Sequence, residues 1–209
     1  RTYYTHTLGR PDLREALSRY LTGLHGAPIG ADRIAVTSAG VSALMLAAQL
    51  VLSPGDRTVV AGPIWPNVVE IPKILSGGVE VVPVEVGQGR WRLDMDRLMA
   101  ALTPGTRVLI LNSPNNPTGW TLPAEARATI LERCRRYGIC LICDDVYERL
   151  AFDRPSAPSF LPLATREDRV IGVNSFSKAW RMTGWRLGWM VCPPALMEGL
   201  GVLIEYNTS

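Results

Sequence analysis

Short apolar runs alternate along the chain with segments in which apolar side chains recur every three or four residues. Buried parallel strands read as continuous apolar runs, whereas helices that cover a sheet have one apolar face. The pattern predicts seven strands, at Ile34–Thr37, Thr58–Ala61, Val79–Val84, Arg107–Asn112, Ile139–Asp144, Arg169–Asn174 and Leu187–Val191. It predicts five helices, at Asp12–Leu21, Val41–Leu52, Met95–Leu102, Ala124–Tyr137 and Pro194–Glu205.

Strands that alternate with helices are typical of βαβ units, in which helices connect parallel strands. The sequence therefore predicts an α/β fold, with three α/β/α layers around a mostly parallel seven-stranded sheet. The 209 residues contain no internal repeat and no long linker. We therefore expect residues 1–209 to form one domain.

Composition and charge exclude several classes of protein. Hydrophobic residues make up 47% of the chain and charged residues 20%, which argues against disorder. The net charge is only +3 and no basic run is present, so we expect no nucleic-acid partner. The longest apolar stretch, Val41 to Leu52, is too short to span a bilayer, so we expect no membrane partner.

Cys140 and Cys143 form a C-x-x-C pattern, which in other contexts binds zinc or carries out redox chemistry. Here the pattern lies within an expected strand, where residues three apart point to opposite faces of the sheet. We therefore expect small buried hydrophobic side chains and no metal site. Reduced cysteines and the lack of a signal-peptide pattern predict a cytoplasmic protein.

Candidate chemistry collects at the C-terminal ends of the expected strands, the edge at which parallel α/β sheets bind ligands. Small, amide, acidic, aromatic and amine groups follow those strands, in the segments 38–40, 62–65, 113–119, 144–147 and 175–178. The only approach to a dinucleotide motif, Gly87-Gln88-Gly89, lacks the third glycine and reads as a loop. A phosphate loop is also missing, since neither lysine follows a glycine.

Lys178 is one of only two lysines in the chain, the other being Lys73. Nearby Arg181 and Arg186 carry like charge, which disfavours the protonated amine and suits a nucleophilic Schiff-base lysine. The alternative is a solvated surface lysine. The polar segments at the neighbouring strand ends favour the nucleophile.

Asp144 ends an apolar strand, where a carboxylate is costly unless it is paired. A cationic ring nitrogen would be a suitable partner. The alternative role, capping of the following helix, fits Asp145 better. Tyr147 lies three residues further on and can bring a phenolic donor to the same edge.

Three other segments each allow two interpretations. Asn116 lies in a stretch typical of a turn, where its amide can also donate to a ring oxygen. Trp65 is either a core residue or a stacking platform for a flat cofactor. The backbone N–H groups around Gly40 precede a helix and can bind phosphate, with Ser38 as a compatible N-cap. Arg186 can pair with the same phosphate.

Three motifs match a known family in order and approximately in spacing. They are Asn116-Pro117-Thr118-Gly119, Asp144-x-x-Tyr147, and Ser175-Phe176-Ser177-Lys178 with Arg186 eight residues later. From about Tyr4 to its end, the chain resembles the pyridoxal-phosphate aminotransferases of fold type I, in the aspartate aminotransferase-like class I and II group. The resemblance implies transfer of an amino group between an amino acid and a 2-oxo acid by a ping-pong mechanism.

The resemblance also implies catalytic roles. Lys178 would form the internal aldimine with pyridoxal 5′-phosphate and later move a proton. Asp144 would pair with the pyridine nitrogen and keep the ring an electron sink. Tyr147 and Asn116 would hydrogen-bond the 3-oxygen of the cofactor. Trp65, in a Pro-x-Trp-Pro-Asn pattern, would stack on its ring.

The phosphate of the cofactor would be bound by Ser175, Arg186 and the backbone at Gly40 and Val41. Tyr4, in a Tyr-x-x-x-x-Gly-x-x-x-Leu-Arg pattern, would reach the phosphate of the other subunit. The resemblance therefore implies a homodimer with shared active sites.

The family also has a C-terminal small domain, with the arginine that binds the substrate carboxylate, and an N-terminal arm. We expect both to lie outside residues 1–209, which would form the cofactor-binding large domain. Two other functions share the cofactor residues or the fold: a carbon–sulfur β-lyase, and a non-catalytic sensor domain of a transcription regulator. The identity of the amino acid substrate is not encoded in these residues.

Overall fold

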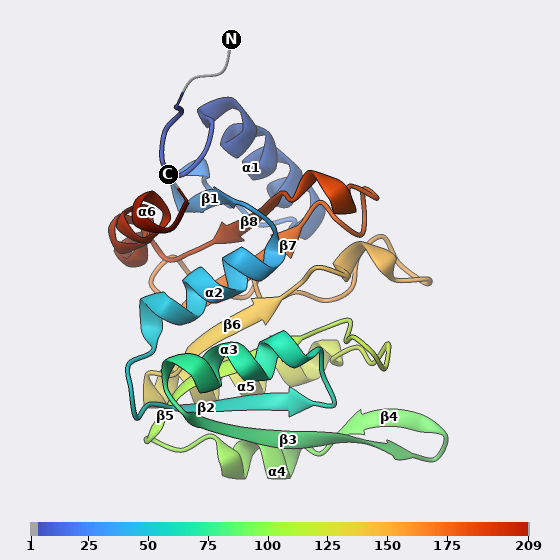
Figure 1. The fold of residues 1–209 in the computed structure, drawn as a ribbon. Coiled ribbons are helices and arrows are strands. Elements are labelled where there is room, and N and C mark those ends of the chain that lie inside the picture. The colour runs from blue at the N-terminus through green and yellow to red at the C-terminus, as the bar shows by residue number, and fades with distance from the viewer. Residues whose placement is uncertain (1–3, 209) are drawn as a thin grey trace.

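A sheet of eight strands runs through the structure, a computed structural model that describes residues 4–208 (Figure 1). Its spatial order is β1-β8-β7-β6-β5-β2-β3-β4. The strands are β1 Ile34–Thr37, β2 Arg57–Gly62, β3 Gly78–Gly87, β4 Arg90–Leu93, β5 Thr106–Asn112, β6 Cys140–Asp144, β7 Val170–Ser175 and β8 Gly188–Val191. Strands β3, β2, β5, β6 and β7 pair in parallel, and the pairs that involve β1, β4 and β8 are antiparallel. This confirms the α/β class and the mostly parallel sheet.

The eighth strand, β4, is a correction to the predicted seven. Strand β3 continues past Val84 to Gly87 and pairs with β4 through a hairpin turn. Gln88 and Gly89 both have positive φ, of 53° and 74°, which suits a tight hairpin turn. The loop predicted at this glycine pair is therefore correct. The strand after this loop, β4, was not predicted because it is mostly exposed and has no continuous apolar run.

All five predicted helices are present, and a sixth, α3, was not predicted. The helices are α1 Pro11–His25, α2 Gly40–Val51, α3 Pro66–Leu75, α4 Met95–Ala101, α5 Ala124–Tyr137 and α6 Pro194–Thr208. Helix α3 contains Pro66 in its first turn and Pro72 inside it, and an internal proline argues against a helix in sequence. Among the described residues, no helix is both long and apolar enough to cross a membrane.

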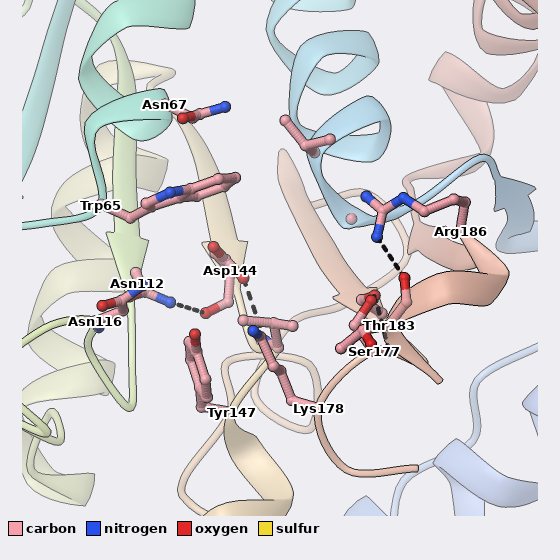
Figure 2. A pocket seen from close by; sticks show the side chains of 14 residues that line it. Trp65, Asn67, Asn112, Asn116, Asp144, Tyr147, Ser177, Lys178, Thr183 and Arg186 are labelled. Carbon is pink, nitrogen blue, oxygen red and sulfur yellow. Dashed lines mark hydrogen bonds between the residues drawn. The ribbon is translucent and has the colours of Figure 1, made fainter. Parts of the chain in front are cut away.

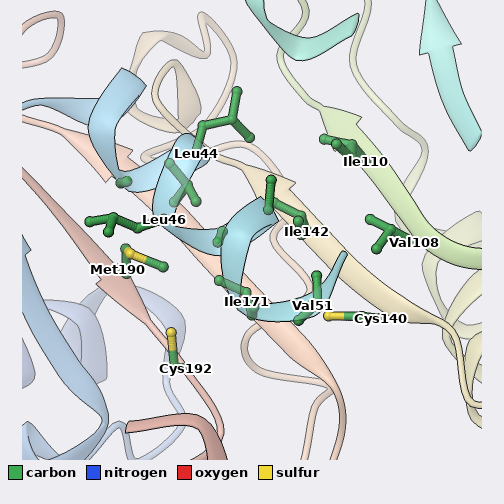
Figure 3. Close-up of a cluster of buried hydrophobic side chains, with 14 of the residues drawn as sticks. Leu44, Leu46, Val51, Val108, Ile110, Cys140, Ile142, Ile171, Met190 and Cys192 are labelled. Carbon is green, nitrogen blue, oxygen red and sulfur yellow. The ribbon is translucent and has the colours of Figure 1, made fainter. Parts of the chain in front are cut away.

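Two apolar clusters lie on opposite faces of the sheet and give the three layers. Helices α2, α3 and α6 cover one face, where α2 packs on strands β5 to β8 (Figure 3). Helices α4 and α5 cover the other face. Cys140 belongs to the first cluster and Cys143 to the second, as the alternation of side chains along a strand predicts. All four cysteines are free and buried.

Helix α1 packs near the β1–β8 edge of the sheet, on the face opposite α2 (Figure 1). Leu17 and Leu21 of α1 contribute to a third apolar cluster that includes Trp189 of β8. Phe176, two residues before Lys178, packs against this cluster. The third cluster therefore connects the N-terminal helix with the segment that follows β7.

Candidate functional site

A cavity of about 340 Å³ opens where the parallel strands end (Figure 2). Nine of the ten residues that the sequence singles out line it: Gly40, Val41, Trp65, Asn116, Asp144, Tyr147, Ser175, Lys178 and Arg186. The tenth, Tyr4, does not line the cavity, and its side chain is 95% exposed. Segments far apart in the sequence therefore meet at the edge that parallel sheets use for ligands.

Asp144 is the last residue of β6, and its carboxylate faces the cavity (Figure 2). Its Oδ1 accepts a hydrogen bond from the backbone N–H of Val146 at 3.2 Å. Burial raises the pKa of Asp144 to about 6, because a charge loses hydration inside the protein. Within residues 4–208, no ion pair involves this carboxylate. A cationic group of a ligand at this position would remove the cost of the buried charge.

The neighbouring Asp145 is buried and does not cap a helix, so the cap predicted for it is wrong. Its Oδ2 accepts a hydrogen bond from the Ser159 hydroxyl at 2.8 Å. The short helix that follows, at Glu148–Leu150, has Tyr147 as its N-cap residue, without a side-chain cap. The sequence could not separate these roles because the two carboxylates are adjacent. Strand alternation turns them in opposite directions.

The loop after β5 places Asn116 at the cavity. Asn115 closes the loop: its backbone N–H donates to the Trp120 carbonyl at 2.8 Å, and its Oδ1 accepts from the Thr118 hydroxyl at 2.8 Å. The side chain of Asn112 connects this loop to β6. Its Oδ1 accepts from the Asn116 N–H at 2.8 Å, and its Nδ2 donates to the Asp144 carbonyl at 3.1 Å.

Lys178 lies on the turn after β7, between two aromatic residues that anchor the turn. Phe176 packs 4.8 Å from Trp189, and Trp180 packs 5.7 Å from Trp189 and 5.4 Å from Tyr20, measured between ring centroids. The Lys178 amine lies 5.9 Å from the centre of the Tyr147 ring. The aromatic contacts hold the turn on α1 and β8, so that the amine faces the Tyr147 side of the cavity (Figure 2).

The opposite end of the cavity is formed by the start of α2 and by Arg186 (Figure 2). Helix α2 begins at Gly40, and its N-cap residue is Ala39, so the N-cap predicted for Ser38 is wrong. Ala39 has no side-chain oxygen, and in the described structure no side chain caps this helix. Its first N–H groups are thus free to bind an anion, which the helix dipole also favours.

A close approach between α2 and β8 shapes this end of the cavity. A Cβ atom at Gly188 would lie 2.7 Å from the carbonyl carbon of Ala39 and 2.8 Å from the nitrogen of Gly40. Only glycine lets the two backbones meet in this way. Two residues earlier, Arg186 holds its guanidinium at the cavity, where Nη1 donates to the Thr183 carbonyl at 2.8 Å.

Ser175 lines the cavity, but its hydroxyl is bound within the protein. Its Oγ lies 2.9 Å from the Ser177 hydroxyl and 3.1 Å from the Leu187 carbonyl, and it accepts from the Ser177 N–H at 3.1 Å. These contacts close the turn that carries Lys178. Ser177, which also lines the cavity, was not singled out by the sequence.

Trp65 occupies a position that fits the core interpretation, and its stacking on a cofactor stays a prediction. It is partly buried against the apolar cluster beneath α2 and α3, and it also lines the cavity opposite Tyr147 (Figure 2). It is the N-cap residue of α3, so the helix that was not predicted positions it.

Five further residues line the cavity to which the sequence analysis assigned no role: Asn67, Asn112, Val146, Ser177 and Thr183. Asn112 had a usable signal, since it is a polar residue that ends the apolar run of β5. Asn67 lies in the first turn of α3 and was missed together with that helix.

The cavity combines complementary chemistry along one axis. Arg186 and the N–H groups of α2 favour an anion at one end, and the free carboxylate of Asp144 favours a cation at the other. Trp65 lies on one side, and the amine of Lys178 lies across from it (Figure 2). Such a site suits a flat ligand with a phosphate and a basic ring nitrogen, next to a reactive amine.

Comparisons with known proteins show which family the chain belongs to. The family model for aminotransferase class I and II matches residues 1–207. The chain is 34% identical to arginine–pyruvate transaminase from Pseudomonas aeruginosa, over 99% of this chain and 53% of that protein. It is 32% identical to a probable aspartate/prephenate aminotransferase from Thermus aquaticus, over 100% of this chain and 54% of that protein.

A solved structure is similar over the whole fold. The aromatic aminotransferase from Pyrococcus horikoshii superposes with a TM-score of 0.91 and 30% identity, over 99% of this chain and 55% of that one. The chain therefore spans about half the length of the curated relatives it matches.

Proposed function

This chain belongs to the class I and II aminotransferases of fold type I, and on that premise we propose that the whole protein transfers amino groups between an amino acid and a 2-oxo acid. The members of this family use pyridoxal phosphate. The observation that carries the proposal is the meeting of Asp144, Tyr147, Lys178 and Arg186 around one cavity.

The residues present fit pyridoxal phosphate. The buried carboxylate of Asp144 lacks a cation within the described residues, and a protonated pyridine nitrogen would supply one. At the other end, a Cβ at Gly40 would lie 3.1 Å from the Cβ of Ser175, so glycine keeps the backbone N–H accessible beside β7. Arg186 adds a cation for the phosphate.

When bound, the cofactor supplies an electron sink for the α-carbon of the amino acid. Asp144 supports this chemistry because its carboxylate keeps a proton on the ring nitrogen. Tyr147 and Asn116 would donate hydrogen bonds to the ring oxygen, and Trp65 would stack on the ring. Together these residues would orient the ring.

Lys178 is the general base in this proposal. Its Nζ would hold the cofactor covalently, and once the substrate amino group had displaced that bond, the free amine would accept the α-proton of the amino acid. The contacts of Phe176 and Trp180 with the aromatic cluster support this role, because they limit the positions open to the amine.

Labelling of the two lysines tests the proposal. Borohydride reduction of the full-length protein with pyridoxal phosphate, followed by peptide mapping, should place the label on Lys178. Lys73 is the matched control, since it lies on α3 with its amine 2.8 Å from Glu70. Lys178→Arg should lose the label and Lys73→Arg should keep it. Label on Lys73 would contradict the assignment.

The substrates are proposed as an amino acid and a 2-oxo acid, and an assay with a panel of amino acids and 2-oxoglutarate should identify the preferred pair. Formation of a 2-oxo acid without any amino acceptor would indicate the β-lyase alternative instead. Residues for the substrate carboxylate would lie in parts of the protein outside residues 1–209. The free cysteines support a reducing, cytoplasmic location.

We also propose a homodimer in which Tyr4 reaches the phosphate of the other subunit. The full exposure of Tyr4, away from the cavity of its own chain, supports this. Mixing of two impaired full-length variants, Tyr4→Ala and Lys178→Ala, tests it. Each mixed dimer should regain activity at one of its two sites. A mixed dimer that forms and stays as inactive as its parents would refute the shared site.

A further inference from the structure

A second cluster of buried ionisable side chains lies behind the cavity and is not used by the proposed chemistry. The Glu148 and His25 side chains are 2% and 3% exposed. Their atoms Oε2 and Nε2 lie 3.6 Å apart, and within residues 4–208 neither atom has a hydrogen-bond partner. Glu148 directly follows Tyr147, whereas His25 ends α1.

Glu148 connects the two strand ends that carry the site. Its Oε1 accepts a hydrogen bond from Nδ2 of Asn174 at 2.7 Å. Asn174 lies in β7, and its Oδ1 accepts from the backbone N–H of Ser175 at 2.7 Å. Ser175 in turn closes the turn that carries Lys178. A continuous series of contacts thus runs from the residue after Tyr147 to the turn of Lys178.

The charges around Glu148 indicate that it is neutral. Burial, followed by the neighbouring Asp145, raises the pKa of Glu148 well above the ordinary range, whereas the hydrogen bond from Asn174 and then the charge of Arg149 lower it by less. Burial, followed by Arg127, lowers the pKa of His25 to about 4. Tyr20, the other titratable group of α1 near Glu148, is neutral as well, since burial raises its pKa to about 12.

A neutral carboxyl group matches what the surrounding atoms need. Its Oε1 accepts from Asn174, and a proton on Oε2 would lie toward Nε2 of His25. An ionised carboxylate here would be costly, because within residues 4–208 no arginine or lysine forms an ion pair with Glu148. The arrangement therefore favours hydrogen bonding, rather than charge, as the contribution of Glu148.

We propose that Glu148 is a positioning residue of the amino-transfer site, which holds Asn174 and thereby the Ser175–Lys178 turn against the strand end that carries Asp144 and Tyr147. The inference rests on the proposed function. Glu148 would affect the site only through its hydrogen bond with Asn174, and it would not contact the substrate or the cofactor.

Two substitutions of Glu148 in the full-length protein show whether this residue acts through its hydrogen bonds or through a charge. Glu148→Gln keeps an acceptor for Asn174 and a donor for His25, so it should bind pyridoxal phosphate within about threefold of the original protein. Glu148→Ala removes both contacts and should weaken binding about tenfold or more. The readout is the dissociation constant, measured by titration of the cofactor absorbance. If Glu148→Gln is as weak as Glu148→Ala, charge matters and the proposal is wrong.

A matched control separates positioning from general loss of stability. Leu98→Ala creates a cavity beneath α4, where Leu98 is fully buried and lies outside the cofactor cavity. It should lower the unfolding temperature at least as much as Glu148→Ala, with cofactor affinity unchanged within about twofold. An equal loss of affinity in Leu98→Ala would overturn the positioning role.

Asn174→Ala tests the same link from the other side and does not depend on the folding of Glu148→Ala. It should reproduce the loss of cofactor affinity, and the double variant should lose no more than either single variant, because the two residues act together. Additive losses would refute the link. If the original protein itself does not bind pyridoxal phosphate, the proposed function fails, whereas normal binding by all these variants refutes only the role of Glu148.

Discussion

Replacement of Asp144 by asparagine should make the cofactor-free protein more stable while it impairs the site. In the structure the carboxylate is buried at the end of β6 without a cation among the described residues, and burial raises its pKa from 3.8 to about 6. Asparagine has nearly the same shape, and its Oδ1 can still accept from the Val146 N–H. The substitution therefore removes the charge and little else.

The magnitude follows from linkage between protonation and folding. A group whose pKa is higher in the folded protein favours folding in its protonated form, so stability is highest below pH 3.8 and is lost as the pH rises through 6. At 1.36 kcal/mol per pKa unit, the full loss is about 3 kcal/mol. Asp144→Asn lacks this loss. Its advantage should grow from about 1 kcal/mol at pH 4.5 to about 3 kcal/mol at pH 8.

Urea unfolding of the cofactor-free proteins at pH values from 4.5 to 8 measures this advantage. Asp96→Asn, at an exposed carboxylate in the first turn of α4, is the control for loss of a surface charge. An advantage of Asp144→Asn that does not change with pH would refute the reasoning, because it would come from packing rather than ionisation.

Pyridoxal phosphate should reverse the order of stability. A ligand that binds only the folded state stabilises it by RT ln(1 + L/Kd), where L is the free ligand concentration, so at a given concentration tighter binding gives a more stable protein. In the proposed complex the ring nitrogen would pair with Asp144, whereas asparagine cannot hold a full charge there. With saturating cofactor at pH 8, the unfolding temperature of the original protein should therefore exceed that of Asp144→Asn. If Asp144→Asn stays more stable at saturation, the ion pair is not formed.

Three further substitutions test the framework of the site by urea unfolding. Gly188→Ala places a Cβ 2.7 Å from the carbonyl carbon of Ala39, so it should lower the free energy of unfolding by about 3 kcal/mol or more and weaken cofactor binding. An unchanged free energy of unfolding would contradict the close approach. Ala39 has φ 97° and ψ 163°, a backbone conformation that is strained for alanine and favours glycine. Ala39→Gly should therefore raise the free energy of unfolding by about 1 kcal/mol, and a decrease would contradict the strain. Leu109 is fully buried at the centre of β5, so Leu109→Ala should lower the free energy of unfolding by about 2–5 kcal/mol and leave cofactor affinity at 25 °C unchanged. A parallel loss of affinity would show that the core and the site are coupled.

Local pattern in the sequence was enough for most elements and for the core of the site. The apolar run of β5 and the amphipathic segment of α5 appear within a residue of their predicted bounds, and Gly138 ends α5 in the left-handed conformation that glycine adopts easily. Asp144, Tyr147 and Lys178 were found because each lies at or just after the end of an apolar strand, and parallel strands bring their ends together.

Two features depend on three-dimensional packing and could not be predicted from the spacing of apolar residues: strand β4 and the directions of the Asp144 and Asp145 side chains. Strand β4 exists because a hairpin turn aligns it with β3, although its own residues are exposed. Asp144 faces the cavity and Asp145 faces Ser159 only because strand alternation turns them apart.

The contact of Glu148 with Asn174 and His25 joins residues that are distant in the sequence. Periodicity tells which side chains are buried, since burial follows from the spacing of apolar residues along one element. Which buried side chains meet depends on how the elements pack, and that is set by shape and by the need to pair every buried polar group.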